Sequence, residues 1–262
     1  MSWRFLLRPK WLVRHVAVAL LVIATCWLGF WQLGRLDEKR AYRDLVEARQ
    51  QQPAVAVDAL LDAGEPPGSP AVADVLYRSV EATGTYQDAD TVIVDNRTLN
   101  GASGGWVLTP LLLADGTAVV VNRGFVGFDR TGALAAPAAP PGVVRVTGLL
   151  FPSQRRSGIG PTDPTEGTLD VLARADLGRI AAQVPYDVLP AYVQRVASDP
   201  PESTTGASAD AAPLVALGPP DPTEGPHLSY AVQWFTFMTI AAVGYGLLLR
   251  RVARDEGLII RR

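Results

Sequence analysis

The sequence predicts a membrane α + β protein, with two transmembrane helices (N- and C-terminal) flanking an extracytoplasmic antiparallel β meander or small barrel that carries one or two short helices. Two observations support this fold class. Residues 16–33 and 231–249 are apolar and uncharged, and each run can cross a hydrocarbon core of about 30 Å at about 1.5 Å per residue. Between them, short runs rich in Val, Leu, Thr and aromatics alternate with turn formers, as strands do.

The predicted organisation follows from these runs. It consists of a basic cytoplasmic N-terminus (1–15), a transmembrane helix (16–33), a helical extension or linker (34–53), an extracytoplasmic β-rich domain (54–228), a second transmembrane helix (229–249) and a basic cytoplasmic tail (250–262).

The flanking charges predict the orientation. Arg4, Arg8, Lys10 and Arg14 precede the first apolar run without an acid, and further arginines follow the second run. The loop between the runs holds fifteen Lys/Arg against twenty-four Asp/Glu. Since positive residues near span ends stay inside, we expect a multi-pass protein of the plasma membrane with both termini cytoplasmic. A cleaved signal peptide ending before Cys26 is an alternative, but the apolar run continues past that point.

Residues 35–52 contain no Gly or Pro and are rich in helix formers, which predicts that the first helix continues outward until Pro53. The next signal is for strands, which we expect at residues 76–86, 91–99, 105–113, 117–125 and 143–151. Asp115-Gly116 lies between two of these runs and is a strong hairpin signal. Several short strands joined by brief turns predict a meander or small barrel.

The rest of the loop has weaker signals. A short helix is expected at 174–182 with Asp176 in its first turn, and further strands at 191–197 and 214–217. Residues 199–213 are small, polar and Pro-containing, which predicts a mobile insertion.

Composition excludes several kinds of site. No basic patch indicates nucleic acid, and the single Cys26 leaves the loop without a thiol for a Cys-based copper or zinc site. Only His15 and His227 are available, so a multi-His metal site is not expected. The loop has no nucleophile motif of a hydrolase, so an extracytoplasmic hydrolase is an unfavoured alternative.

His227 is the principal candidate, because it lies where the chain enters the second apolar run. Imidazole is an axial ligand of haem iron, and a membrane boundary suits an amphiphilic porphyrin. The alternative is an interfacial histidine that binds headgroups or backbone. Arg97 and Arg123 follow Asn at the ends of apolar strands, and they are candidates to bind a propionate or another anion. Their alternative role is in a turn, paired with a loop acid.

Aromatic and amide side chains gather toward the outer ends of both apolar runs. Trp31 and Trp234 fit an aromatic belt, or a stacking surface for a flat apolar ligand. Gln32 and Gln233 lie at the same boundary, where hydrogen bonding between helices costs least. These four residues are candidates for haem contact or for an inter-helix surface.

Three blocks resemble the surfeit locus protein 1 family, the membrane assembly factors of cytochrome c oxidase. They are residues 28–39 (LGFWQLGRLDEK), the segments GTY, NR, GWVLTP and VNRGF between 84 and 125, and residues 227–235 (HLSYAVQWF). Each block alone is weak, but their order and the two-span arrangement together are specific.

The resemblance implies an assembly factor that is not an enzyme and that assists delivery of haem a to oxidase subunit I. The expected partners are subunit I, other oxidase subunits or assembly factors, and the lipid bilayer. The alternative function is a stably bound accessory subunit of the oxidase or a respiratory supercomplex, with no haem ligation. Fixed stoichiometry with the mature oxidase would favour that alternative.

Overall fold

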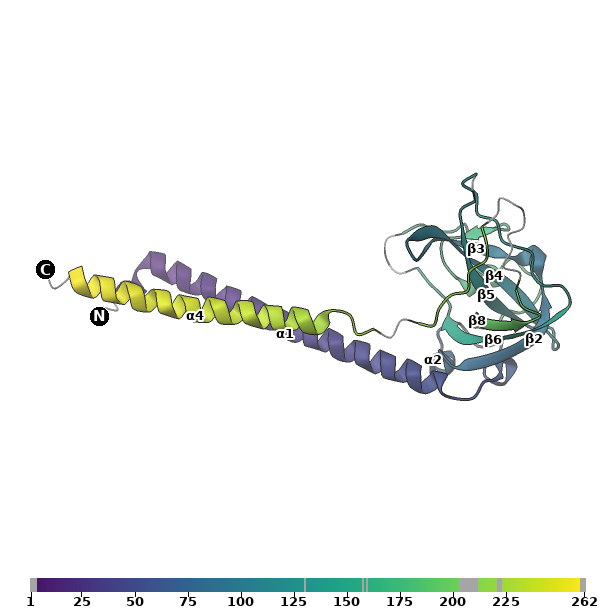
Figure 1. The fold of residues 1–262 in the computed structure, drawn as a ribbon, viewed down its shortest axis with the longest axis horizontal. Coiled ribbons are helices and arrows are strands. Elements are labelled where there is room, and N and C mark those ends of the chain that lie inside the picture. Colours follow the sequence, from purple (N-terminus) through teal and green to yellow (C-terminus); the bar gives the residue numbers. More distant parts are fainter. Residues whose placement is uncertain are drawn as a thin grey trace. The chain divides into compact units, whose positions relative to one another are not determined.

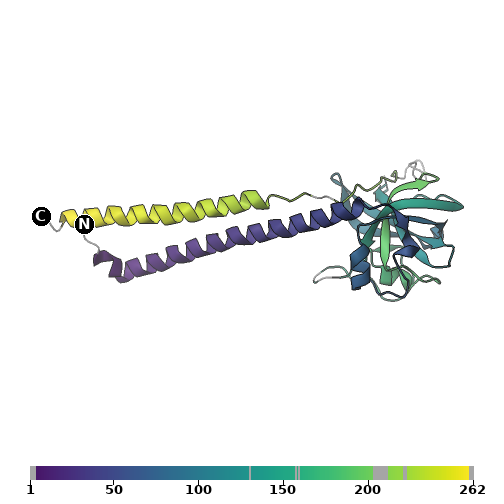
Figure 2. The ribbon, with the colours of Figure 1, turned by 90° about the horizontal axis from the view of Figure 1, so that it is seen from below.

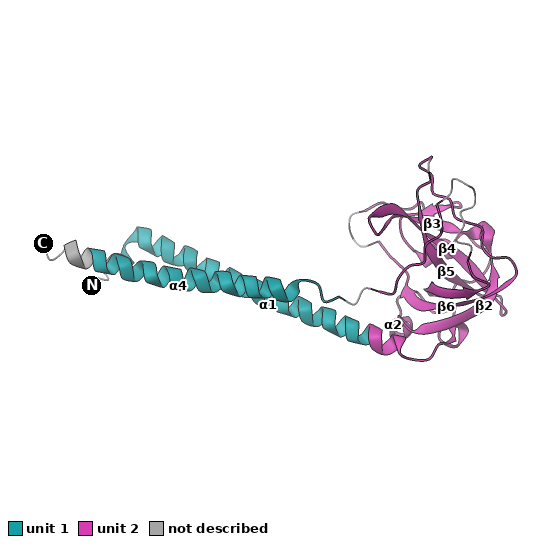
Figure 3. Ribbon diagram, viewed as in Figure 1, with its two compact units in different colours: residues 1–45, 222–262 teal, residues 46–221 magenta. Residues whose placement is uncertain are grey.

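The computed structural model of the chain describes residues 4–259, apart from 130, 157, 159, 203–211 and 221–222. It divides into two compact units, residues 1–45 with 222–262 and residues 46–221, which Figure 3 shows in separate colours. The first unit contains the long helices, and the second contains the strands and the short helices (Figure 1).

Two long helices form the first unit. Helix α1 is Pro9–Gln50 and helix α4 is His227–Ile259, and a short 3-10 turn, Arg4–Leu7, precedes α1. The first helix continues past the apolar run as expected, since α1 runs without a break to Gln50. Both helices are long and apolar enough to cross a membrane.

The two helices lie alongside each other in both views (Figures 1 and 2) and run antiparallel. Much of their apolar surface is exposed: Leu20 is 61% exposed, Ile23 63% and Leu247 59%. Contiguous apolar surface of this kind is unfavourable in water and is typical of an interaction or membrane surface.

Most strands of the second unit lie where the sequence predicts them. They are β1 Val55–Ala56, β2 Ser79–Tyr86, β3 Val92–Leu99, β4 Ala102–Leu113, β5 Ala118–Gly127, β6 Val143–Pro152, β7 Val171–Leu172 and β8 Ala191–Asp199. Three short helical turns, η2 Val57–Ala59, α2 Pro70–Val75 and η3 Asp88–Asp90, and the short helix α3 Leu177–Ala181 complete the unit.

The eight strands form one sheet in the order β1-β2-β6-β8-β5-β4-β3-β7, and an additional pairing joins β2 to β4. That pairing closes β2, β6, β8, β5 and β4 into a ring, so a small barrel is present. Closure depends on Gly84, because a Cβ at this position would lie 2.2 Å from the carbonyl oxygen of Leu112.

The expectation of a purely antiparallel sheet was wrong, because β1–β2, β3–β7 and β5–β8 pair in parallel. β1 and β7 are two residues long, too short to show an alternating pattern. The β5–β8 pairing depends on the crossover through α3, which places residues far apart in the sequence side by side. The strand expected at 214–217 is one bridge, between Val215 and Phe125.

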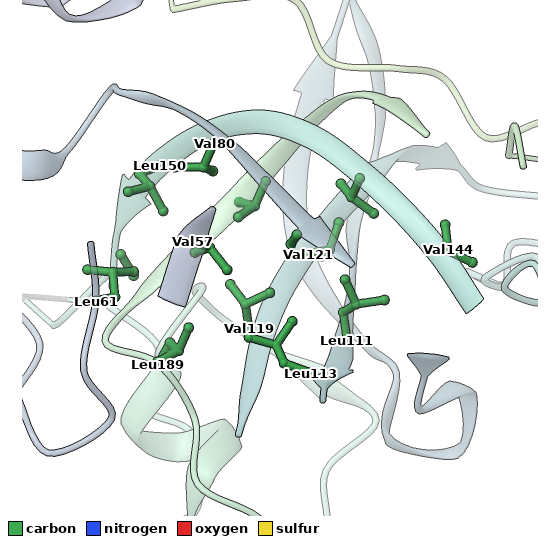
Figure 4. Close-up of a cluster of buried hydrophobic side chains, with 14 of the residues drawn as sticks. Val57, Leu61, Val80, Leu111, Leu113, Val119, Val121, Val144, Leu150 and Leu189 are labelled. Carbon is green, nitrogen blue, oxygen red and sulfur yellow. The ribbon is translucent and has the colours of Figure 1, made fainter. Parts of the chain in front are cut away.

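The main core fills the inside of the ring (Figure 4). Its side chains include Val80, Leu111, Val119, Val121 and Leu150, each fully buried. β5 is buried along nearly its whole length, since Val120 of the same strand joins a second cluster on the other face. A strand covered on both faces needs the continuous apolar run that this segment has.

Helix α3 closes the second cluster. Leu177 and Ile180 of α3 pack there with Leu172, Tyr192 and Val120. Asp176 caps this helix, because its Oδ1 accepts from the backbone N–H of Arg179 at 3.2 Å. The predicted helix is therefore confirmed, with Asp176 as its N-cap.

The expected insertion at 199–213 is anchored where the structure describes it. Asp199 ends β8, where its backbone lies opposite that of Arg145 in β6. Glu202 is buried, and so is Leu214, directly after the segment. Residues 203–211, the centre of that expectation, lie outside the described residues.

Candidate functional site

The strongest candidate site is at the first residue of α4. Pro226 precedes the helix, and its carbonyl accepts from the backbone N–H of Tyr230 at 3.1 Å and from the hydroxyl of Ser229 at 2.7 Å. His227 therefore begins a regular helix directly after a tight turn, and its backbone is fixed by the first helical bonds.

The ring of His227 contacts α1. Its Nδ1 lies 2.8 Å from Oε1 of Gln32. An amide oxygen can only accept, so Nδ1 carries the proton and donates it to Gln32. Nε2 then has a free lone pair, and none of the hydrogen bonds in the described part of the chain uses it. Metal-bound histidines commonly have this arrangement, with one nitrogen held by an acceptor and the other directed to the metal.

Gly225 leaves room beside this nitrogen. A Cβ at position 225 would lie 3.6 Å from Nε2 of His227 and 3.5 Å from Cδ2. Its φ of +67° also lies in the left-handed region that favours glycine. Any side chain at this position would both strain the turn and cover the free nitrogen.

An ion pair holds the turn against α1. Glu224 accepts from Nε of Arg40 at 3.1 Å and from Nη1 of Arg43. All three side chains are partly exposed, so solvent and salt screen these ion pairs and they contribute little to stability. Their role is to fix the position of the turn that carries Gly225 and His227.

Close packing of α1 and α4 follows within two to three turns. Phe235 lies against Gly29, where a Cβ would come within 2.6 Å of the ring, and its ring meets that of Phe30 edge-on at a centroid distance of 5.4 Å. An open apolar face of α4 begins at this point, and it consists of Val232, Phe235, Thr236, Thr239 and Ile240.

The other membrane-boundary candidates are not brought to the His227 ring. Trp31 is 47% exposed, and Gln233 is exposed. Trp234 stacks edge-on against Phe237 of its own helix, with centroids 6.0 Å apart. Of the four, Gln32 alone makes a described hydrogen bond to His227.

Arg97 lies in the β unit, half-buried. Its guanidinium carbon is 4.4 Å from the centre of the Trp106 ring, and Nη2 donates to Oε1 of Gln154 at 3.0 Å. Burial lowers the pKa of Arg97, and nearby Arg174 lowers it further. No carboxylate among the described residues lies within ion-pair distance of it, and its buried Nε lacks a described partner. Because its charge is not neutralised by a described carboxylate, Arg97 can still bind an anion.

Arg123 is fully buried, and the carboxylate that binds its guanidinium belongs to Glu202 of the same chain. Nε donates to Oε1 of Glu202 at 3.0 Å and Nη2 to Oε2 at 2.7 Å. The carbonyls of Pro137 and Ala138 accept two further bonds. This geometry matches the alternative of an arginine paired with a loop acid, and leaves little capacity for an external anion.

Sequence reasoning missed the partners of the candidate residues. Glu202 lies in a segment expected to be mobile, and Glu224 precedes the candidate histidine without an obvious role. The positive φ of Gly225 could have been inferred from the Gly-Pro pair before the helix. Within the described residues, no group of three or more His, Cys, Asp or Glu side chains could hold a metal ion.

Comparison with known proteins identifies the family of the chain. The model of the SURF1 family matches residues 19–239. A protein of Mycobacterium tuberculosis described as an uncharacterized SURF1-like protein is 30% identical over 251 residues, covering 92% of this chain and 84% of that protein. SURF1-like proteins of Monosiga brevicollis and Rickettsia felis are 25% and 22% identical, covering 90% and 86% of this chain and 87% and 92% of their own lengths. The chain therefore belongs to the SURF1 family.

Proposed function

We propose that this protein is a membrane-anchored assembly factor of cytochrome c oxidase that binds haem a through His227 and presents it to subunit I. One observation carries the proposal: Gln32 holds Nδ1 of His227 and leaves Nε2 free. The family membership supports the link to oxidase assembly.

The residues around His227 fit a porphyrin. Nε2 would be the axial ligand to the iron, and Gly225 leaves the space beside this nitrogen open. The open apolar face of α4, which begins at Val232, five residues after His227, would offer contact to the macrocycle. Gln32 would fix the ring orientation and raise the basicity of the ligand.

The proposed topology places α1 and α4 across the plasma membrane with both termini in the cytoplasm. It is supported by the arginine-rich flanks and by the exposed apolar faces of both helices. Unit 46–221 would then lie outside the cytoplasm. We propose that this unit docks on oxidase subunits or on companion assembly factors, and that Arg97 binds a carboxylate there or a haem propionate.

The proposed activity has no catalytic turnover. A carrier must bind its cargo reversibly and in one orientation, and a single protein ligand to the iron suits release to a final site with more ligands. A permanently bound accessory subunit without haem ligation is the competing function. It would co-purify with mature oxidase at fixed stoichiometry and would tolerate loss of the His227 imidazole.

The test is the visible spectrum of the full chain, purified in detergent after expression with haem a synthesis. We expect wild type and Ser229→Ala to retain haem a and His227→Ala to lose it at equal protein level. Ser229→Ala is the matched control, because its hydroxyl bonds only the turn carbonyl of Pro226. A wild type without pigment, or equal pigment in His227→Ala, would refute His227 as the ligand.

A further inference from the structure

Each of the two histidines of the chain makes a side-chain hydrogen bond from one long helix to the other. At one end of the pair, Nδ1 of His227 on α4 lies 2.8 Å from Oε1 of Gln32 on α1. At the other end, Nδ1 of His15 on α1 lies 2.6 Å from the hydroxyl of Tyr245 on α4. Each helix therefore supplies one histidine near its own N-terminal end and one partner near its middle.

The two bonds belong to one antiparallel register. From His15 to Gln32 α1 advances about 17 residues, and from His227 to Tyr245 α4 advances about 18, so both helices span about 26 Å between the bonds at about 1.5 Å per residue. This is close to the thickness of a hydrocarbon core, about 30 Å. The bonds thus lie at the two edges of the apolar stretch.

The closest described contact between the two bonds lies near one of them. Phe235 contacts Gly29 and Phe30 within about two turns of the Gln32–His227 bond. Toward the other end, the His15 ring lies edge-on to Tyr245 at a centroid distance of 5.7 Å. Between these points Thr25 is buried and Met238 is half-buried, so the helices also pack through apolar contacts. The bond to Tyr245 adds a directional polar contact at the end opposite His227.

The partners assign opposite tautomers to the two rings. Nε2 of His15 lies 3.2 Å from the carbonyl oxygen of Leu6, which can only accept, so Nε2 carries the proton and Nδ1 accepts from Tyr245. In His227 the proton is on Nδ1. His15 has both nitrogens occupied and cannot bind a ligand without breaking a bond, whereas His227 has one nitrogen free.

We propose that His15 is a positioning residue for His227: its hydrogen bond to Tyr245 fixes the register of α4 on α1 in which His227 meets Gln32. Loss of the His15–Tyr245 bond then frees the ring of His227 from Gln32. The consequence for haem rests on the proposed function, but the coupling between the two histidines does not.

Histidine-selective ¹⁵N NMR of the haem-free full chain tests the coupling directly, because the chain contains two histidines. We expect wild type to show one ring protonated on Nε2 and one on Nδ1. Tyr245→Phe should convert the Nδ1-protonated signal of His227 to a mixture in which the Nε2–H form, preferred by free imidazole, is the larger part. His15→Gln should have the same effect and leaves His227 as the single labelled ring.

Tyr230→Phe is the matched control, since it removes a hydroxyl from the same helix at an exposed residue. Its His227 signal should remain that of wild type. An unchanged His227 signal in folded Tyr245→Phe and His15→Gln would overturn the proposal. Haem retention, measured on the same preparations, separates the two hypotheses: coupled tautomers in a wild type that binds no haem would remove the haem function and keep the coupling.

Discussion

Arg123 and Glu202 form a bidentate ion pair in the interior of the β unit, with Nε–Oε1 at 3.0 Å and Nη2–Oε2 at 2.7 Å. Arg195 lies beside it and donates through Nε and Nη2 to the carbonyl oxygen of Arg123. Nε of Arg195 also lies 4.0 Å from Oε1 of Glu202, so the carboxylate ties the segment after β8 to two buried arginines.

Glu202→Gln should strongly destabilise the β unit. The substitution leaves the guanidinium of Arg123 buried without its anion, and breaking a buried pair of this kind costs about 3–5 kcal/mol. Denaturant unfolding of the full chain in detergent would measure the loss. Glu81→Gln serves as the matched control, because Glu81 is exposed on β2 and its replacement should change stability by less than about 0.5 kcal/mol. Equal, small effects of both variants would show that the pair contributes little.

Stability should fall at alkaline pH partly through Tyr86. Burial raises the pKa of Tyr86, and the charge of Glu202 raises it further. Because the folded-state pKa is above the unfolded value of about 10, the contribution is complete below about pH 10 and is lost as the pH rises beyond it. Unfolding measured from pH 8 to 11 should show a steeper decline in wild type than in Tyr86→Phe. Parallel pH profiles would contradict this assignment.

The strands of the barrel could be predicted because each is long enough to show its pattern. β4, β5 and β6 are each ten or more residues long and rich in Val and Leu, and they lie between turn formers. The closure through Gly84 and Leu112 could not be predicted, since it depends on the approach of two backbones far apart in the sequence. β1 and β7, at two residues each, carry no local signal at all.

The candidate residues of the site could be identified from the sequence, but the contacts between them could not. His227 and Gln32 were each recognised as polar groups at a membrane boundary, yet they are 195 residues apart and their pairing depends on the register of two apolar helices. The distance between the helices at this point depends on close contacts such as Gly29 with Phe235, which no periodic pattern reveals. Arg123 was misleading for a related reason: its partner Glu202 lies in a segment whose composition indicates mobility.

Gly29→Ala should separate α1 from α4 near the site. The added Cβ would come within 2.6 Å of the Phe235 ring, so the helices must move apart or the ring must turn. Small residues at helix interfaces in membranes allow such close approach. We expect the His227 ring to lose its single Nδ1-protonated form in the ¹⁵N spectrum. Gly34→Ala is the control, because no atom lies within 4 Å of a Cβ at that position.

Gly29→Ala combined with Phe235→Leu should restore the wild-type signal, since the smaller side chain makes room for the added methyl group. A wild-type spectrum in Gly29→Ala alone would show that this contact does not set the distance between the helices.

Gln32→Leu should weaken haem a binding while leaving the axial ligand in place. The amide is the acceptor that holds Nδ1 of His227, and loss of such a partner typically lowers metal affinity about 10–100-fold. Haem titration of the purified chain, followed by absorbance, would give the affinity. Tyr230→Phe is the control, because it removes a hydroxyl from an exposed side chain of α4 that is not part of the open apolar face. If Gln32→Leu bound haem as tightly as wild type and His227→Ala did not, the ring would be held by the helix backbone alone, and Gln32 would have no role in ligation.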